Sequence, residues 1–92
     1  MLIETEELKS YLRIDTNDED GFVSELSKSA EYLCRDIARI DGDLDERETG
    51  LMRMAVLFAA AYLYEHREEA DHHQLTLSLR SLLSTIRRGD FF

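Results

Sequence analysis

The sequence predicts an all-α domain in which about four helices pack around one central apolar helix. The 92 residues contain no Pro and only four Gly, whereas Leu, Ala, Glu and Arg are plentiful, and this composition favours helices over sheets. The stretch 51–64, LMRMAVLFAAAYLY, offers eleven apolar residues without a break after Arg53. A chain of this length is expected to form one domain, which we place at residues 1–92.

The apolar run is predicted to lie in a central helix of residues 46–69. At about 3.6 residues per turn it presents apolar side chains on every side, so we expect the rest of the chain to enclose it. The run is much shorter than the roughly 20 residues that span a bilayer, so no membrane contact is expected. Asp45 is the predicted N-cap, and Glu48 completes a capping box.

A short first helix is predicted over residues 3–14. Thr5 is its expected N-cap, and Leu8, Tyr11 and Leu12 share one face. A helix of this length is not stable alone. We therefore expect it to dock on the other helices through that face.

The clearest amphipathic helix is predicted over residues 21–40, with Asn17 or Asp18 as its cap and Gly42 as the helix stop. Its apolar residues fall within an arc of about 120° at about 100° per residue, so they should point inward. These residues are Phe22, Val23, Leu26, Ala30, Leu33, Cys34, Ile37 and Ile40.

The last helix is predicted over residues 75–88, and it contains basic residues but no acid. Its inward stripe is expected to consist of Leu75, Leu79, Leu82, Leu83 and Ile86. The basic residues Arg80, Arg87 and Arg88 are candidates for a partner interface. The chain ends in Phe91 and Phe92, which either form a disordered end or anchor the tail on a partner or on the core.

Two acidic segments mimic calcium loops. In residues 15–20, DTNDED, oxygen-bearing side chains alternate as in an EF-hand, but Asp20 and Leu26 stand where that loop requires Gly and Glu. In residues 41–45, DGDLD, Glu46 likewise replaces the required Gly. Both segments are therefore interpreted as turns rather than metal sites.

The histidines do not form a recognisable zinc motif either. His72 and His73 are adjacent, which is not the spacing of a helical zinc pair, although His66, Glu69 and His73 would share a face if the central helix ran on. The sequence also lacks a Gly-rich phosphate loop, a nucleophile elbow and a Cys/His cluster. We therefore expect no metal, no cofactor and no catalytic activity.

The single cysteine and the N-terminal residues indicate the cellular compartment in which the protein works. Cys34 cannot form an internal disulfide and falls at an inward helical position, so we expect a buried, inert thiol. The opening MLIETEEL is acidic where a signal peptide would be basic. The protein is expected to work in a cytoplasm.

The net charge of −9 is concentrated in the first half of the chain. Residues 1–50 hold 15 acidic and 6 basic residues, whereas residues 51–92 hold 5 of each. An acidic surface promotes solubility. It also disfavours binding to nucleic acid, since binding phosphate requires clustered Lys and Arg that displace counterions.

Two stretches together resemble the small head-tail connector (adaptor) proteins of tailed bacteriophages and prophages. One is EELKSYLRIDTNDED at residues 6–20, which an amphipathic helix follows directly, and the other is LMRMAVLFAAAYLYEHREE at residues 51–69. The closing LTLSLRSLLSTIRR is also similar to the last helix of that family. The resemblance covers nearly the whole chain in the right order, and YLYEHREE is its most specific part.

The resemblance implies a structural, all-α subunit of the virion with no catalytic residues. Such subunits assemble as a homo-oligomeric ring below the portal protein, and the ring extends the DNA channel and meets tail-side connector or stopper proteins. A ring requires a contact between two different surfaces of neighbouring subunits. The acidic first half and the basic last helix supply two such surfaces, so Arg80, Arg87 or Arg88 is expected to face a neighbour's acidic residues or the portal.

The residues leave open a second interpretation. A small acidic helical protein could instead be a binding module that mimics DNA or inhibits a DNA-binding protein. Such a module would carry its carboxylates along one exposed surface at phosphate-like spacing and would act as a monomer or dimer.

Overall fold

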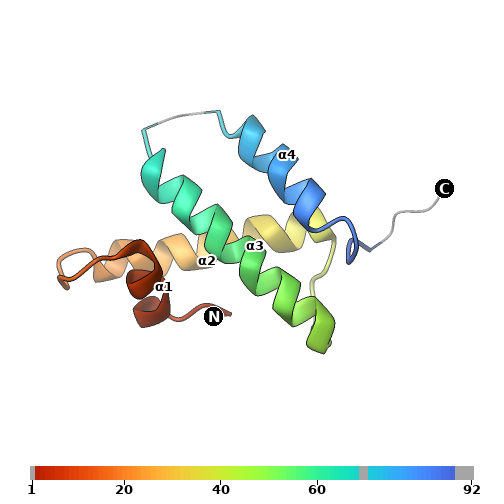
Figure 1. The fold of residues 1–92 in the computed structure, drawn as a ribbon, viewed down its shortest axis with the longest axis horizontal. Helices are drawn as coiled ribbons and strands as arrows, with labels where there is room; N and C mark the ends of the chain where they lie inside the picture. The colour runs from red at the N-terminus through yellow and green to blue at the C-terminus, as the bar shows by residue number, and fades with distance from the viewer. Residues whose placement is uncertain (1, 69–70, 89–92) are drawn as a thin grey trace.

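The computed structural model describes residues 2–68 and 71–88, which fold into four helices (Figure 1). The described residues contain no strand, so the predicted all-α fold is confirmed. The helices are α1 (Thr5–Leu12), α2 (Asp20–Ala38), α3 (Glu46–Glu65) and α4 (His73–Leu82).

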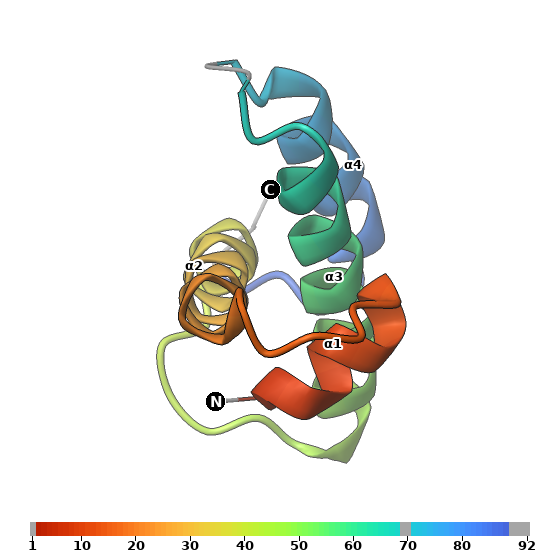
Figure 2. The same ribbon diagram turned by 90° about the vertical axis from the view of Figure 1, so that its left-hand side faces the viewer.

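The four helices lie in two layers. Figure 2 shows α2 on one side and α1, α3 and α4 together on the other. Helix α3 contacts all three other helices, as predicted for the central helix, and α2 does so as well. Helix α2 therefore forms one layer by itself, and the other three helices pack against it.

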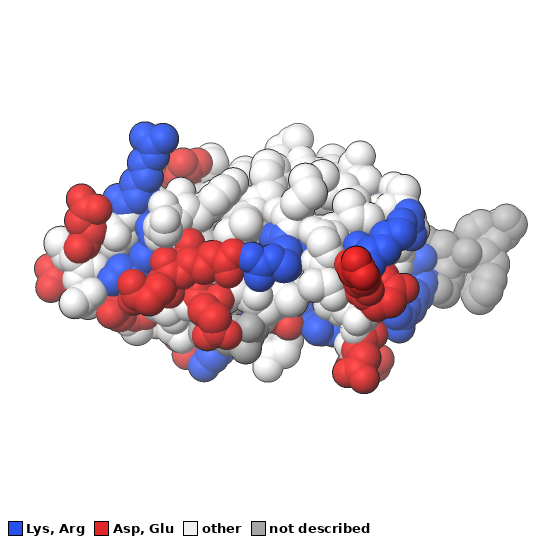
Figure 3. Space-filling model, turned by 60° about the horizontal axis from the view of Figure 1, so that its bottom comes forward, with Lys and Arg blue, Asp and Glu red and all other residues white. Residues whose placement is uncertain are grey.

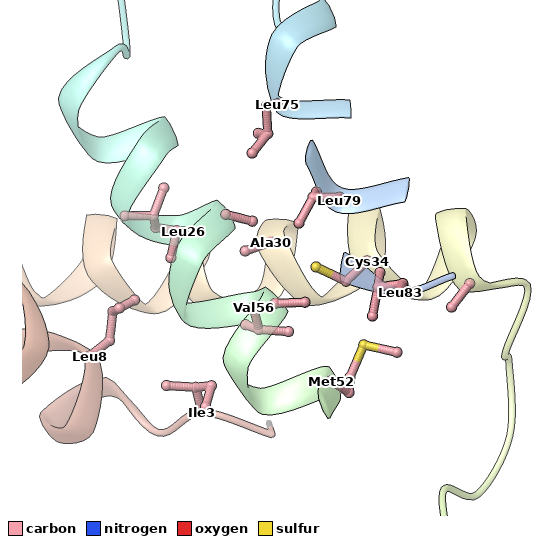
Figure 4. Close-up of a cluster of buried hydrophobic side chains, with 14 of the residues drawn as sticks. Ile3, Leu8, Leu26, Ala30, Cys34, Met52, Val56, Leu75, Leu79 and Leu83 are labelled. Atoms are coloured by element: carbon pink, nitrogen blue, oxygen red, sulfur yellow. The ribbon is translucent and has the colours of Figure 1, made fainter. Parts of the chain in front are cut away.

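The buried faces of α2 and α3 both carry small side chains. Ala30 and Cys34 on α2, and Val56 and Ala59 on α3, are fully buried. Small side chains let two helices approach closely where their ridges and grooves meet. Larger side chains from all parts of the fold close the core around this contact, as Figure 4 shows for several of them, and the fully buried ones include Ile3, Leu8, Ile40, Met52, Leu75, Leu79 and Leu83.

Hydrogen bonds fasten the N-terminal segment to α2 and α3. The Ser27 hydroxyl of α2 donates to the Ile3 carbonyl at 2.5 Å. The Leu2 amide donates to Glu31 Oε1 at 2.9 Å, and Arg53 of α3 donates to the Leu2 carbonyl at 2.9 Å. The short first helix is thus held by tertiary contacts, as expected for two turns that are unstable alone.

The predicted N-caps of the first two helices are wrong. Thr5 is the first residue of α1 rather than its cap, and Glu4 precedes it without a side-chain capping bond. Glu19, not Asn17 or Asp18, occupies the cap position of α2, also without such a bond. Tertiary contacts rather than local caps decide where these helices begin.

The acidic segment before α2 folds around a lysine. The Lys9 ammonium donates to Asn17 Oδ1 at 2.7 Å and lies 2.8 Å from Asp20 Oδ1. Lys9 is buried, and its hydrogen bond to Asp20 raises its pKa against the opposite effect of burial. This pairing ties the segment to α1 and gives its oxygen-rich composition a structural role.

Helices α1 and α2 both end at an arginine in the left-handed region. Arg13 has φ 61° and Arg39 has φ 60°. After Arg39, the Ile40 amide donates back to the Arg35 carbonyl at 3.0 Å, and Ile40 is buried. This is a Schellman-type end with its usual apolar contact. The predicted stop at Gly42 is therefore wrong, because the turn that buries Ile40 comes earlier.

The predicted capping box at the start of α3 is confirmed. Asp45 Oδ1 accepts from the Glu48 amide at 2.8 Å, and Glu48 Oε1 accepts from the Asp45 amide at 3.0 Å. Arg88 Nη2 lies 2.8 Å from both carboxylate oxygens of Glu48. The Asp45 amide first, and Arg88 second, hold the pKa of Glu48 below its usual value of 4.5.

Helix α3 ends at Glu65 rather than near Glu69, which lies outside the described residues. The His66 amide donates to the Tyr62 carbonyl at 2.9 Å, and the two rings stack with centroids 4.0 Å apart. A histidine at this position closes the last turn, whereas the acidic residues that follow oppose the helix dipole. The predicted helix was therefore too long at this end.

Helix α4 is also shorter than the predicted helix of residues 75–88. Turns follow it, yet Leu83 and Ile86 are buried as predicted, because the turns fold them onto the core. The Arg88 amide then donates to the Ala38 carbonyl at 2.8 Å. The last described segment is thereby attached to the end of α2.

Phe22, which was predicted to point inward, is 39% exposed. The Arg67 guanidinium lies over its ring, 5.3 Å from the centroid, and 4.9 Å from the centroid of Tyr64. Arg67 also pairs with Glu19 at 3.3 Å. A cation covers the ring face here, which stabilises an aromatic side chain at the surface.

The other inward predictions for α2 agree with the structure. Cys34 is fully buried, and burial, together with the nearby Glu31 carboxylate, raises its pKa to about 12. The predicted buried thiol is therefore confirmed. Leu33 and Ile37 pack against the core while partly exposed, and the fully or nearly fully buried residues are Val23, Leu26, Ala30 and Ile40.

Two alanine substitutions in α4, one buried and one exposed, test which face of this helix packs on the core. Leu79→Ala should lower the free energy of unfolding by about 2–5 kcal/mol, because it removes a fully buried side chain and leaves a cavity. Leu77→Ala, where the side chain is 48% exposed, should lower it by less than about 1 kcal/mol. Urea unfolding followed by circular dichroism measures both. An equal loss of unfolding free energy in the two variants would contradict the burial of Leu79 on the inward face of α4.

The Glu48 carboxylate should make stability depend on pH. A lowered folded-state pKa stabilises the fold above the ordinary value of 4.5, and this contribution is lost as the pH falls through the lowered pKa. Glu48→Gln keeps a capping side chain but removes the charge. Wild type should therefore be the more stable protein at neutral pH, and the difference should shrink in acid.

Urea midpoints of the two proteins over a pH series measure this effect. Glu46→Gln is the control, because it removes an exposed carboxylate from the same helical turn without removing a partner of Arg88. A constant difference between wild type and Glu48→Gln at every pH would show that the charge of Glu48 contributes nothing.

Candidate partner interface

Helix α3 leaves one face exposed to solvent, contrary to the prediction that the rest of the chain encloses it. Met54 is 60% exposed and Phe58 is 40% exposed, one turn apart. At about 100° per residue, both lie nearly opposite the fully buried Val56. Three helices are too few to surround a fourth, because α2 covers its back while α1 and α4 cover only its flanks (Figure 2).

A groove of about 270 Å³ follows this exposed face. Tyr11 of α1 and Leu82 of α4 line it together with α3 and are 52% and 38% exposed, so the prediction that they point inward is wrong. Each follows a fully buried leucine by three residues, Leu8 or Leu79, and is therefore rotated by about 60° from it. That rotation brings each side chain to the edge of the packed surface. The residues lining this α3 groove are Tyr11, Met54, Leu57, Phe58 and Leu82.

The charged side chains are unevenly distributed over the surface. Figure 3 shows a broad area without charged side chains in its upper part, whereas acidic and basic side chains gather below it and towards both ends. In the charged areas, red and blue side chains lie side by side. Charge is therefore missing from one area of this face and mixed in sign over the rest of it.

Another exposed aromatic side chain lies on α2. Tyr32 is 72% exposed, and at about 100° per residue it points almost directly away from the buried Ala30 and Cys34. Tyr32 and Arg35 line two neighbouring hollows, of about 500 Å³ and 280 Å³, together with charged side chains such as Lys28, Asp36 and Arg39. We call Tyr32 and Arg35 together the Tyr32 ridge.

The predicted interface residues are dispersed rather than gathered at one site. Arg80 is exposed on α4 and makes no hydrogen bond or ion pair with the described part of the chain. Arg87 donates to the Ile37 carbonyl at 2.9 Å, and Arg88 binds Glu48. Phe91 and Phe92 lie outside the described residues.

The sequence interpretation missed the α3 groove and the Tyr32 ridge. Met54 and Phe58 belong to an unbroken apolar run. Because every face of such a helix is apolar, the sequence does not indicate which face remains exposed. Tyr32 did carry a signal, because an aromatic residue opposite the inward arc of an amphipathic helix must be exposed. Exposed aromatic side chains of this kind are enriched at protein interfaces.

Two further kinds of feature are absent from the described residues. Among residues 2–68 and 71–88, no group of three His, Cys, Asp or Glu side chains could hold a metal ion. No helix in this part of the chain combines the length and the apolar character needed to cross a membrane. The hollows of this surface include the α3 groove and the two beside Tyr32.

Comparison with known proteins agrees with an assembly role. The family model described as "Phage gp6-like head-tail connector protein" matches residues 3–87, which is nearly the whole chain and includes both the α3 groove and the Tyr32 ridge. No curated protein and no solved structure matches the chain. The match over 3–87 confirms the resemblance found in the sequence, and the chain belongs to the phage gp6-like head-tail connector family.

Proposed function

We propose that copies of this chain form a ring on the portal protein and extend the channel through which DNA enters and leaves the phage head. Family membership makes the chain a structural component of the phage head-tail junction and implies contact with portal and tail proteins. We propose in addition that the copies form a closed ring between the portal and the tail-side proteins, and that the inner wall of this ring lines the DNA channel. Tail-side connector or stopper proteins would bind the ring on the face away from the portal.

The exposed α3 groove is the observation that best supports self-assembly. A soluble monomer of this size gains nothing by leaving Met54 and Phe58 in water on its central helix. The free-energy cost of exposing these two side chains to water is removed when a neighbouring protein covers them. A small domain with a modest core also gains stability from such contacts.

The chain should act in the virion, after assembly in the host cytoplasm. The family places it in the phage particle. A structural role requires no catalytic step, and we propose that it performs none. Its partners are then the neighbouring copies, the portal and the tail-side proteins.

A channel wall should let DNA slide rather than hold it. The net charge of −9 opposes phosphate, and the basic side chains are not clustered into a phosphate-binding patch on the face shown in Figure 3. Few counterions would be released by contact with DNA, so the affinity for DNA should be low. DNA would then pass without specific binding.

The DNA-mimic alternative gains no support from the family match, and the structure weighs against it. A mimic needs unpaired carboxylates in a row, whereas many carboxylates here bind basic side chains of the same chain. These pairs include Glu7 with Arg53, Glu19 with Arg67, Glu31 with Arg35, and Glu48 with Arg88.

The interface residues inferred from the sequence remain part of this proposal. Arg80 is the strongest of them, because it is exposed and unpaired with the described residues. Arg87 and Arg88 already make bonds within the chain, so they would contact a partner only with their remaining donors. Phe91 and Phe92 would serve as a tail anchor on a partner.

Charge reversal at Arg80 tests the assembly. When the chain is mixed with the portal protein of the phage that encodes it, native mass spectrometry should show many wild-type copies per portal. Arg80→Glu should weaken this capture about tenfold, because one charge-assisted contact is lost at each copy. The melting temperature should stay unchanged, since Arg80 is exposed.

Arg47→Glu is the matched control. Arg47 is exposed in the first turn of α3, so its reversal changes the net charge equally without touching α4. Equal capture of Arg80→Glu and wild type would remove Arg80 from the interface. Failure of the portal to capture wild-type chains at all would contradict the ring.

A further inference from the structure

We propose that residues 89–92 fold back along α3 and lay the rings of Phe91 and Phe92 on its exposed apolar face. The occupant of the α3 groove in the free protein is thus a segment of the same chain, which lies outside the described residues. The proposal concerns the free protein and does not require the ring. It has one consequence for assembly, because a partner that binds the groove must first displace this segment.

The described chain stops beside the first turn of α3. Arg88 Nη2 lies 2.8 Å from Glu48 Oε1, and the Arg88 amide donates to the Ala38 carbonyl at 2.8 Å. Both the side chain and the backbone of Arg88 are therefore held. Residue 89 is a glycine, which lets the backbone turn in either direction after this attachment. Residues 89–92 thus start from a fixed point next to α3.

A strip of surface leads from this point to the groove. Leu51 follows Glu48 by three residues, Met54 follows Leu51 by three, and residues three apart are neighbours on the surface of a helix. Leu51 is partly exposed and Met54 is 60% exposed, so the strip becomes more open towards the groove. The two steps together cover about 11 Å, whereas four extended residues span about 13 Å. Residues 89–92 are therefore long enough to bring Phe92 to Met54.

The groove and the segment have matching chemistry. The lining of the groove consists of two aromatic rings, one thioether and two leucine side chains, and it includes no charged residue. Aromatic rings pack edge to face or offset against one another, and a methionine adapts its shape to a ring. The hollows beside Tyr32 suit these rings less well, because charged side chains line them. The one charged residue of the segment, Asp90, can remain in water.

A contact within one chain needs less area than a contact between two molecules. A free partner forms a stable interface by burying about 1,200–2,000 Å² in total. A segment that is already held at Arg88 has a high effective concentration at the groove, so a smaller area suffices. The free energy gained by burying two rings is partly offset by the conformational entropy that four residues lose when they are ordered. The contact is therefore weak enough for a larger partner to displace it.

Methionine methyl signals test this contact by nuclear magnetic resonance of the full chain. Met54 lines the groove, whereas Met52 is fully buried and serves as the internal control. Replacing both rings by Phe91→Ala and Phe92→Ala removes their ring currents from the groove. The Met54 methyl signal should therefore shift while the Met52 signal stays in place. An unshifted Met54 signal would overturn the proposal. Both substitutions lie outside the described core, so the helical circular dichroism should not change.

The rate of alkylation measures how often the groove is covered. Met54→Cys is treated with a maleimide in dilute solution, with and without residues 89–92. Their removal should speed the reaction about threefold if the segment covers the groove about two thirds of the time. The native Cys34 is buried with a pKa of about 12, so it should not compete. Equal rates with and without the segment would contradict the contact.

Leu77→Cys is the matched control for alkylation. Leu77 is 48% exposed and does not line the groove, so removal of residues 89–92 should leave the rate at this position unchanged. An equal acceleration at Leu77→Cys would mean that the segment affects the whole molecule rather than the groove, and it would overturn the proposal.

Other occupants of the groove give different results. A contact within one chain leaves the Met54 signal unchanged on dilution, whereas a signal that depends on protein concentration would show that a second copy covers the groove. A Met54 signal that responds only to added portal protein would show an empty groove in the free chain. Either result would overturn the proposal. The measurements on the free chain need no portal, so failure of the portal to capture the chain would contradict the ring and leave this contact intact.

Discussion

The structure depends on the close contact between α2 and α3. Small buried residues on both helices, including Ala30 and Cys34 on one and Val56 and Ala59 on the other, let the two backbones approach. The remaining elements are arranged around this pair. Helices α1 and α4 each pack against both α2 and α3, and the last described residues return to the end of α2.

This arrangement cannot bury α3 on all sides. An α-helix that is apolar around its whole circumference needs more neighbours than a chain of this size can supply. The unburied face becomes the α3 groove. An exposed apolar face is typical of a protein-binding site, and the chain belongs to a family of head-tail connector proteins.

The acidic composition has a structural use as well as an electrostatic one. The oxygen-rich segment before α2 surrounds Lys9, and Glu48 both caps α3 and binds Arg88. Part of the acidic charge is thus paired within the fold with specific basic side chains. The surplus remains at the surface, where it favours solubility and low affinity for DNA.

The sequence by itself determined the all-α class, the four helices, the capping box at Asp45 and the burial of Cys34, because helical periodicity and capping are local properties. The resemblance in its motifs also indicated the family. Only the tertiary structure decided where helices end and which apolar side chains stay exposed. Tyr11 and Leu82 lie at the edges of otherwise inward faces, and Met54 lies within a uniform apolar run. Their exposure depends on how far neighbouring helices reach, which is a property of packing and cannot be read from periodicity.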